Sequence, residues 1–181
     1  MMNPTPGMLT KGAAEEISTF LNMLLADEYV LYTKTRNAHW NATGPDFSEL
    51  HHFFGIQYKV LDVMIDDIAE RVRSLGRFAL GSMKDFLSVT RMCEDRLDFG
   101  ASTEIVQTMI ADHETIIRTI RHEIISASDN NNDQTTSDFV TGLIEQHEKM
   151  AWMLRAFLSE PDFSATRHIR TVTNQRIVNY Q

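Results

Sequence analysis

The chain has 181 residues, of which 43% are hydrophobic and 23% charged, and its formal net charge at pH 7 is −8. This composition is typical of a folded domain with a sizeable core and excludes an intrinsically disordered chain. The acidic balance gives a surface that on average repels nucleic acid and anionic lipid.

The single cysteine, Cys93, excludes an internal disulfide bond and is typical of a reducing compartment. The first residues, MMNPTPGMLTKG, lack the pattern of a secretory signal. No apolar run approaches the roughly 18 residues that a membrane span needs. We therefore expect a soluble, cytoplasmic protein with no membrane partner.

Residues 1–12 are expected to form a flexible N-terminal arm, and a long amphipathic helix follows from Ala13 to about Asn41. Gly44 and Pro45 together stop this helix. Its apolar positions recur at intervals of three and four residues, at Ile17, Phe20, Leu21, Leu24, Tyr29 and Tyr32.

The second predicted helix runs from Phe47 to Leu75 and would be about 43 Å long. Asp46 is expected to be its N-cap, with Glu49 completing a capping box. Gly76 is the natural residue to follow its last turn. Gly55, inside it, costs about 1 kcal/mol of helix stability relative to alanine.

Beyond Gly76 the pattern predicts a short helix near Met83–Met92, a third long helix from Thr103 to about Ala127, and a fourth from Thr136 to Ser159. Ser102 is a candidate cap for the third helix, residues 128–133 form a polar loop, and Pro161 ends the fourth. Residues 161–181 are expected to be a C-terminal tail.

Four long helices in two pairs, joined by a long link, predict an all-α fold. The connectivity is that of a ferritin-like four-helix bundle, with a short helix in the long crossover between helices two and three. One domain, residues 13–160, accounts for the bundle.

The segment from His39 to Glu70 carries the residues with candidate chemistry. His51 follows His39 by twelve residues, and Asp66 and Glu70 lie one helical turn apart. On a continuous helix His51, Asp62, Asp66 and Glu70 fall within about 100° of each other. Imidazole and carboxylate groups together suit iron, zinc or manganese, so this flank predicts a metal site or a facing subunit.

Two motifs in this segment carry a family resemblance. Residues 37–51 read N-A-H-W-N-x-x-G-P-x-F-x-x-L-H, and residues 66–76 read D-x-x-A-E-R-x-x-x-L-G. At this mutual spacing they closely resemble the Dps family, the miniferritins of starved cells. The resemblance is dense over the first two helices and extends to the others by layout only.

The resemblance implies a homo-oligomeric shell, a dodecamer, with di-iron oxidation sites between two-fold-related subunits. His39 and His51 would come from one subunit, and Asp66 and Glu70 from its neighbour, with Glu70 bridging two irons. Trp40 would match the family's aromatic residue near the site, which can supply or trap an electron.

The chain departs from the family at Gly55, where an aspartate usually follows the second histidine by four residues. Losing this carboxylate would weaken one iron position or pass its role to water or to another side chain. Asp62, on the same flank, and His52, beside His51, are the candidate substitutes.

Alternatives to this metal site remain open. Asp66 and Glu70 could form an ordinary solvated helix face with Arg71 and Arg73 nearby. A site within one bundle normally needs a Glu-x-x-His pair on each of two helices, and only Glu49 with His52 supplies one. The histidines of the third and fourth helices are interpreted as structural or surface residues: His113, His122 and His147.

The resemblance therefore implies a ferroxidase and iron-storage protein that oxidises Fe²⁺, preferably with hydrogen peroxide, stores ferric mineral and protects against oxidative stress. The alternative is a non-catalytic shell that coats DNA or binds a structural metal such as zinc, with a degenerate oxidation site. Lys11 is the only basic residue of the N-terminal arm, which argues against DNA binding. Arginines of the tail could either contact DNA or pack against the shell.

Overall fold

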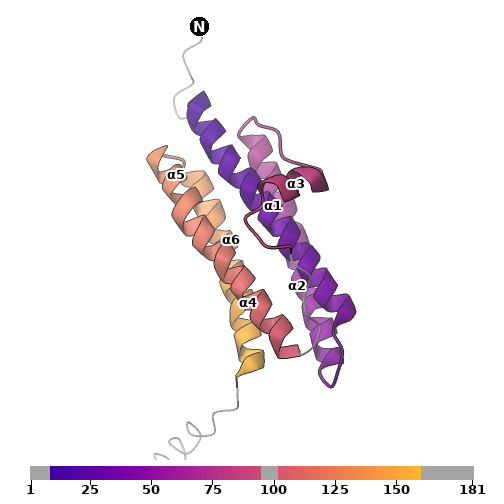
Figure 1. Cartoon of the computed structure of the whole chain (residues 1–181). Helices are drawn as coiled ribbons and strands as arrows, with labels where there is room; N and C mark the ends of the chain where they lie inside the picture. The colour runs from indigo at the N-terminus through magenta and orange to yellow at the C-terminus, as the bar shows by residue number, and fades with distance from the viewer. Residues whose placement is uncertain (1–8, 95–101, 160–181) are drawn as a thin grey trace, which may run out of the picture.

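The computed structural model describes residues 9–94 and 102–159 of the chain. Its helices are α1 (Lys11–Asn41), α2 (Phe47–Ser74), α3 (Met83–Val89), α4 (Ser102–Thr119), the π-helical turn η1 (Ile120–Ile124), α5 (Ile125–Asn130) and α6 (Gln134–Leu158). α1 packs along α2 and α4 along α6, and the two pairs lie side by side, with α3 packed against α1 (Figure 1). This confirms the predicted all-helical four-helix bundle with a short helix in its crossover. Most of the predicted arm and the whole tail, 161–181, lie outside the described residues.

The core fills the space between the four long helices with apolar side chains. Each helix contributes residues that are almost completely buried, among them Leu21, Leu24, Phe54, Ile68, Ile116 and Leu154. Their burial removes apolar surface from water and drives the pairing of the helices. None of the helices in the described ranges combines the length and hydrophobicity needed to cross a membrane.

Glycine ends the second helix as predicted. Gly76 has a φ of +76°, its N–H donates to the carbonyl of Arg73 (2.9 Å), and the N–H of Arg77 donates to Val72 (3.3 Å). These two bonds form a Schellman motif, which satisfies carbonyls that the helix end leaves free.

Several predicted helix ends are wrong by a few residues, and side-chain caps explain two of them. α1 begins at Lys11 rather than Ala13, because Thr10 accepts a hydrogen bond from the Ala13 N–H (3.1 Å). α6 begins at Gln134, because Asp133 accepts from the Thr136 N–H (3.1 Å). Asp46 holds the N-cap position of α2 without a side-chain cap bond, so the capping box does not form.

The third long helix was expected to end near Ala127, but helical structure continues through η1 and α5 to Asn130. The predicted polar loop therefore shrinks to the residues after Asn130. The five-residue π turn lies between α4 and α5 and contains Glu123. Arg91, in the crossover link between α3 and α4, pairs with Glu123. π turns of this kind often mark positions where a side chain must be re-aimed.

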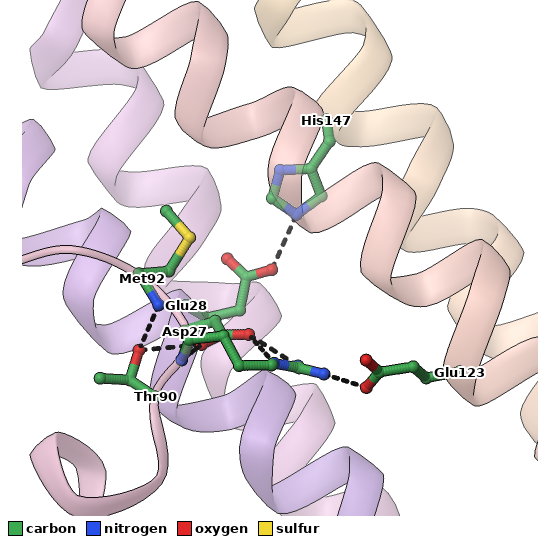
Figure 2. A network of polar contacts seen from close by, with 7 residues as sticks. Asp27, Glu28, Thr90, Met92, Glu123 and His147 are labelled. Carbon is green, nitrogen blue, oxygen red and sulfur yellow. Dashed lines mark hydrogen bonds and ion pairs between the residues drawn. The ribbon is translucent and has the colours of Figure 1, made fainter.

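A buried aspartate anchors the crossover link to the bundle. Asp27 on α1 is 1% exposed and accepts hydrogen bonds from the Thr90 hydroxyl (2.8 Å), the Arg91 N–H (2.7 Å) and the Arg91 guanidinium (2.6 Å). Met92 in turn donates to the Thr90 hydroxyl (Figure 2). Because Arg91 also pairs with Glu123, one aspartate ties the link to α1 and to the π turn.

Candidate metal centre

His39 and His51 face each other across the hairpin that joins α1 to α2. The two rings stack with centroids 3.8 Å apart and planes 23° from parallel, and both residues are half-buried. The Nδ1 atom of His39 lies 2.6 Å from the carbonyl oxygen of His51, and Nδ1 of His51 lies 2.8 Å from the carbonyl oxygen of His39. Each histidine thus fixes the orientation of the other.

This reciprocal pairing decides the tautomer of both rings. A carbonyl oxygen only accepts, so each Nδ1 must carry the hydrogen and donate it. In a neutral imidazole the other nitrogen, Nε2, then keeps its lone pair. An Nδ1–H bonded to a backbone carbonyl is the arrangement that orients metal-ligating histidines in proteins. Both rings are therefore prepared to bind a metal through Nε2.

Gly55 makes room for the His39 ring. A Cβ atom built at Gly55 would lie 3.2 Å from Cε1 and 3.4 Å from Nδ1 of His39. The imidazole packs directly over the bare backbone of α2, where any side chain would press against it. This close approach is a structural reason for glycine at a position where the resemblance leads one to expect aspartate.

Gly55→Ala is therefore expected to separate stability from metal binding. Alanine gains about 1 kcal/mol of helix propensity, while its Cβ displaces His39 by a few tenths of an ångström. We expect an unchanged or higher melting temperature and about tenfold weaker Co²⁺ binding, measured by titration of the visible absorption bands. Gly142→Ala in α6 is the matched control, because nothing lies within 4 Å of its added Cβ. Unchanged Co²⁺ affinity in Gly55→Ala would show that the position of His39 is not limiting.

The predicted carboxylates lie on an exposed face of α2. Asp62 and Asp66 line a cavity of about 380 Å³, together with Tyr29 and Leu80, and Glu70 is exposed one turn beyond. Their side chains are open to solvent and to any molecule that docks on this face.

The nearby arginines do not neutralise these carboxylates. Arg71 donates to both oxygens of Asp133 (3.1 and 3.2 Å), and Arg73 donates to the carbonyl of Arg77 (2.7 Å). Within residues 9–94 and 102–159, neither Asp66 nor Glu70 forms an ion pair. The alternative of a solvated face balanced by Arg71 and Arg73 therefore loses its main support.

The histidine pair and the carboxylates cannot share a metal within one chain. His51 and Asp66 are fifteen residues apart on one continuous helix, which separates them by roughly 22 Å along its axis. Accordingly, the described part of the chain contains no group of three or more His, Cys, Asp or Glu side chains that could hold a metal ion. Each chain presents its candidate ligands in two separate groups along α2, a candidate histidine half-site and a candidate carboxylate half-site.

The two candidate substitutes for the missing aspartate lie in different places. Asp62 lies beside Asp66 and so belongs to the carboxylate half-site. His52 is exposed and lines a separate groove of about 370 Å³ between α2 and α6, with Phe53 and Met153. Glu49 lines the same groove, whereas His39 and His51 do not line it.

Trp40 is 60% exposed and belongs to a group of aromatic rings around one cation. The guanidinium carbon of Arg36 lies 4.9 Å from the Trp40 ring centroid, 5.1 Å from that of Tyr58 and 5.6 Å from that of Tyr32. Tyr58 also meets the His39 ring edge-on, with centroids 5.3 Å apart. The i, i+4 spacing of Tyr32, Arg36 and Trp40 was a signal that could have revealed part of this group; nothing local pointed to Tyr58.

A second polar cluster lies in the bundle interior. Nε2 of His147 lies 2.7 Å from a carboxylate oxygen of Glu28, and Nδ1 of His147 lies 2.9 Å from Nδ1 of His113. All three side chains are fully buried, and Figure 2 shows Glu28 pointing from α1 toward His147. Burial and the neighbouring His147 hold the pKa of His113 well below its ordinary value.

This cluster connects three helices, α1, α4 and α6, and agrees with the structural interpretation of His113 and His147. His122 is exposed. Glu28 and Asp27 were not singled out from the sequence, although two adjacent acidic residues inside an apolar helical stripe are the signal that could have revealed them.

Comparison with known proteins places this geometry in context. Residues 19–162 match the model of the ferritin-like domain family. The chain is 42% identical over 150 residues to an uncharacterised low temperature-induced protein of Nostoc, covering 83% of this chain and 84% of that protein. It is 35% identical over 147 residues to DNA protection during starvation protein 2 of Bacillus anthracis, covering 81% and 99%.

Solved structures of Dps proteins have the same fold as this chain. The Dps protein from Vibrio cholerae, described as a member of a superfamily of ferritin-like diiron-carboxylate proteins, superposes with a TM-score of 0.80 at 28% identity, covering 88% of this chain and 99% of that one. Dps from Thermosynechococcus elongatus superposes with a TM-score of 0.78 at 29% identity, covering 83% and 95%.

Proposed function

This chain belongs to the Dps family of ferritin-like proteins, and from that membership we propose that it is a ferroxidase that oxidises Fe²⁺ with hydrogen peroxide and stores the ferric product. Iron storage and protection against oxidative damage are the general functions that membership supports. The specific chemistry rests on the residues of this chain.

The observation that carries the proposal is the reciprocal bonding of His39 and His51. Two imidazoles held with Nδ1 on backbone carbonyls offer two Nε2 lone pairs to an incoming Fe²⁺. A metal ligand must be held in one tautomer and one orientation, and these two bonds hold both rings in that way.

A second copy of the chain would complete each site. A two-fold axis crossing α2 near residues 58–59 would run two copies of this helix antiparallel and bring His51 of one copy opposite Asp66 of the other. The same operation forms two equivalent sites at once, each with two imidazoles from one copy and Asp66 and Glu70 from the other. We place these pairs in a dodecameric shell, with Asp62 as the residue that compensates for Gly55.

The chemistry follows from holding two Fe²⁺ ions together. Each ion gives one electron, so that hydrogen peroxide and two protons yield two molecules of water without releasing a hydroxyl radical. Carboxylates favour the ferric product by their charge, and Glu70 would be the residue shared between the two ions. Coordination lowers the pKa of iron-bound water and so promotes hydrolysis toward the stored mineral.

The proposal predicts the outcome of anaerobic iron loading. Apo-protein is loaded with Fe²⁺ and given limiting hydrogen peroxide, and the ferric absorbance and the iron that co-elutes with protein are recorded. We expect about one peroxide consumed per two Fe²⁺ and soluble retained iron, with both lost in His39→Ala/His51→Ala. Oxidation no faster than in buffer, with ferric precipitate outside the protein, would favour a non-catalytic shell instead.

A further inference from the structure

An apolar groove runs along the bundle between α2 and α6. It has two parts, of about 610 Å³ and about 370 Å³, and Ile56 lines both. Most of its lining side chains are apolar, among them Phe53, Val60, Met64, Phe139, Met153 and Phe157. Two others, Ile56 and Val63, are 49% and 60% exposed. Apolar surface gathered in one groove marks a place where another segment or molecule packs.

The groove follows from the way the helices pair. α1 packs closely along α2 and α4 along α6, whereas α2 and α6 contact each other sparsely, so the bundle is open on its α2–α6 side. The second copy of the proposed pair would face the flank of α2 that carries Asp62 and Asp66. Val60, in the groove, lies about 160° around α2 from Asp62, and Val63 marks the boundary because it lines both sides. The proposed pairing therefore leaves the groove open.

The C-terminal tail is attached at one end of this groove. α6 ends at Leu158, and Phe157 in its last turn lines the groove. From Phe157 to Phe139 the groove follows α6 for eighteen residues, or about 27 Å. Residues 160–181 are long enough to follow it, because they would span about 33 Å as a helix and more as an extended chain. Attachment at this point also gives the tail a high effective concentration at the groove.

The composition of the tail complements the groove. Residues 163–181 contain three arginines and no aspartate or glutamate. The apolar side chains of this segment include Phe163, Ile169, Val172, Ile177, Val178 and Tyr180. Glu49 and Asp67 line opposite ends of the groove, and Lys59 lies between them. Burial of apolar side chains would supply most of the binding free energy, and the exposed charge pairs would mainly favour this segment over an acidic one.

We propose that residues 163–181 fold back along α6 of the same chain and cover the α2–α6 groove. The tail then closes the open side of the bundle and removes apolar surface of the groove from water. Its arginines lie near the carboxylates at the ends of the groove instead of reaching DNA. This assigns to the tail the second of the two roles that the sequence leaves open, and it does not depend on the iron chemistry.

The first experiment identifies what lies over the groove in the full-length protein as it assembles. Cys93→Ser removes the single native cysteine, and Gln146→Cys then carries a benzophenone maleimide that joins to neighbouring C–H bonds on irradiation. Gln146 is exposed and lines the groove. Gln107→Cys on α4 is the matched control, because Gln107 is exposed and lines neither part of the groove. We expect about tenfold more product that joins residues 163–181 to position 146 of the same chain than to position 107.

The products distinguish the tail from other occupants of the groove. Mass spectrometry identifies the two joined segments, and a denaturing gel separates products within one chain from products between chains. A product that joins position 146 to the bundle of another chain would overturn the inference, because a second copy would then cover the groove. A product with the tail of another chain would overturn the folding back along α6. Equal amounts of tail product from positions 146 and 107 would also overturn it, because the tail would then have no preferred position.

The second experiment fills the groove. Gly142 lines it and nothing lies within 4 Å of a Cβ added there, so Gly142→Trp places a large ring in the groove without a clash at Cβ. Trypsin cleavage at Arg167, Arg170 and Arg176 then measures how often the tail leaves the groove. We expect cleavage about tenfold faster in Gly142→Trp than in the parent or in Gly142→Ala, and close to that of a synthetic peptide of residues 163–181. Equal rates in the three proteins would contradict the inference, as would cleavage of the parent as fast as that of the free peptide.

Discussion

Two inactive variants of this chain, assembled in one shell, are expected to recover about a quarter of the wild-type rate of iron oxidation. One variant carries His39→Ala and His51→Ala, and the other carries Asp66→Asn and Glu70→Gln. Each alone is expected to break every site, because in the proposed pair a site draws its imidazoles from one copy and its carboxylates from the other. The roughly 22 Å between His51 and Asp66 on α2 is the reason that a single chain cannot rescue itself.

The expected fraction follows from the symmetry of the pair. With random mixing at equal amounts, about half of the two-fold pairs contain one copy of each variant. In such a pair one site receives intact histidines and intact carboxylates, and the other receives neither. The hybrid is prepared by unfolding the two variants together and reassembling them, and mass spectrometry confirms that they have mixed. Stopped-flow measurement of the ferric absorbance then gives the rate of iron oxidation.

The control is the same two proteins assembled separately and then combined, which should stay inactive. A hybrid with confirmed mixing and no recovered activity would show that the half-sites do not meet across subunits. Substantial activity in either parent would show instead that one half-site is sufficient. The experiment therefore tests whether the site forms between subunits, whichever oxidant the protein uses.

Much of the fold could be predicted because its signals are local. The intervals of three and four between Ile17, Leu21 and Leu24 reflect one buried helix face, and glycine at position 76 reflects the positive φ that ends α2. The pairing of helices follows from the lengths of the connections. The end of the third helix was predicted too early because a polar run such as Ser128-Asp129-Asn130 can either cap a helix or continue it. The π turn at 120–124 was not predicted because it gives the sequence no simple hydrophobic periodicity.

The candidate site was predictable in its residue types but not in its geometry. The spacing of His39 and His51 indicated ligands, but no sequence pattern shows that each Nδ1 bonds the other's carbonyl. The contact that explains Gly55 joins positions on two helices, and so does the contact of Tyr58 with Arg36. Such features depend on packing between elements, which a single sequence does not encode locally.

Glu28→Ala is expected to lower the free energy of unfolding by about 3 kcal/mol or more. The substitution removes the carboxylate that His147 bonds at 2.7 Å and leaves a fully buried imidazole nitrogen without a partner. It also leaves a void where the fully buried Glu28 side chain was. His147 in turn holds His113, so the loss extends to the contact between α4 and α6. Chemical unfolding at one fixed protein concentration measures the change, because the proposed assembly would make apparent stability depend on concentration.

Two further variants separate pairing from burial. Glu148→Ala removes an acidic residue that is half-exposed and pairs with Arg121, and it should cost less than about 1 kcal/mol. Glu28→Leu/His147→Phe replaces both buried partners with apolar groups of similar size. This double variant should recover part of the loss, because no polar atom of the pair is then left unpaired, while Nδ1 of His113 loses its bond to His147. A double variant as unstable as Glu28→Ala would mean that the cluster stabilises the bundle through its own hydrogen bonds. If Glu28→Ala lowers the free energy of unfolding no more than Glu148→Ala does, water must replace the missing carboxylate.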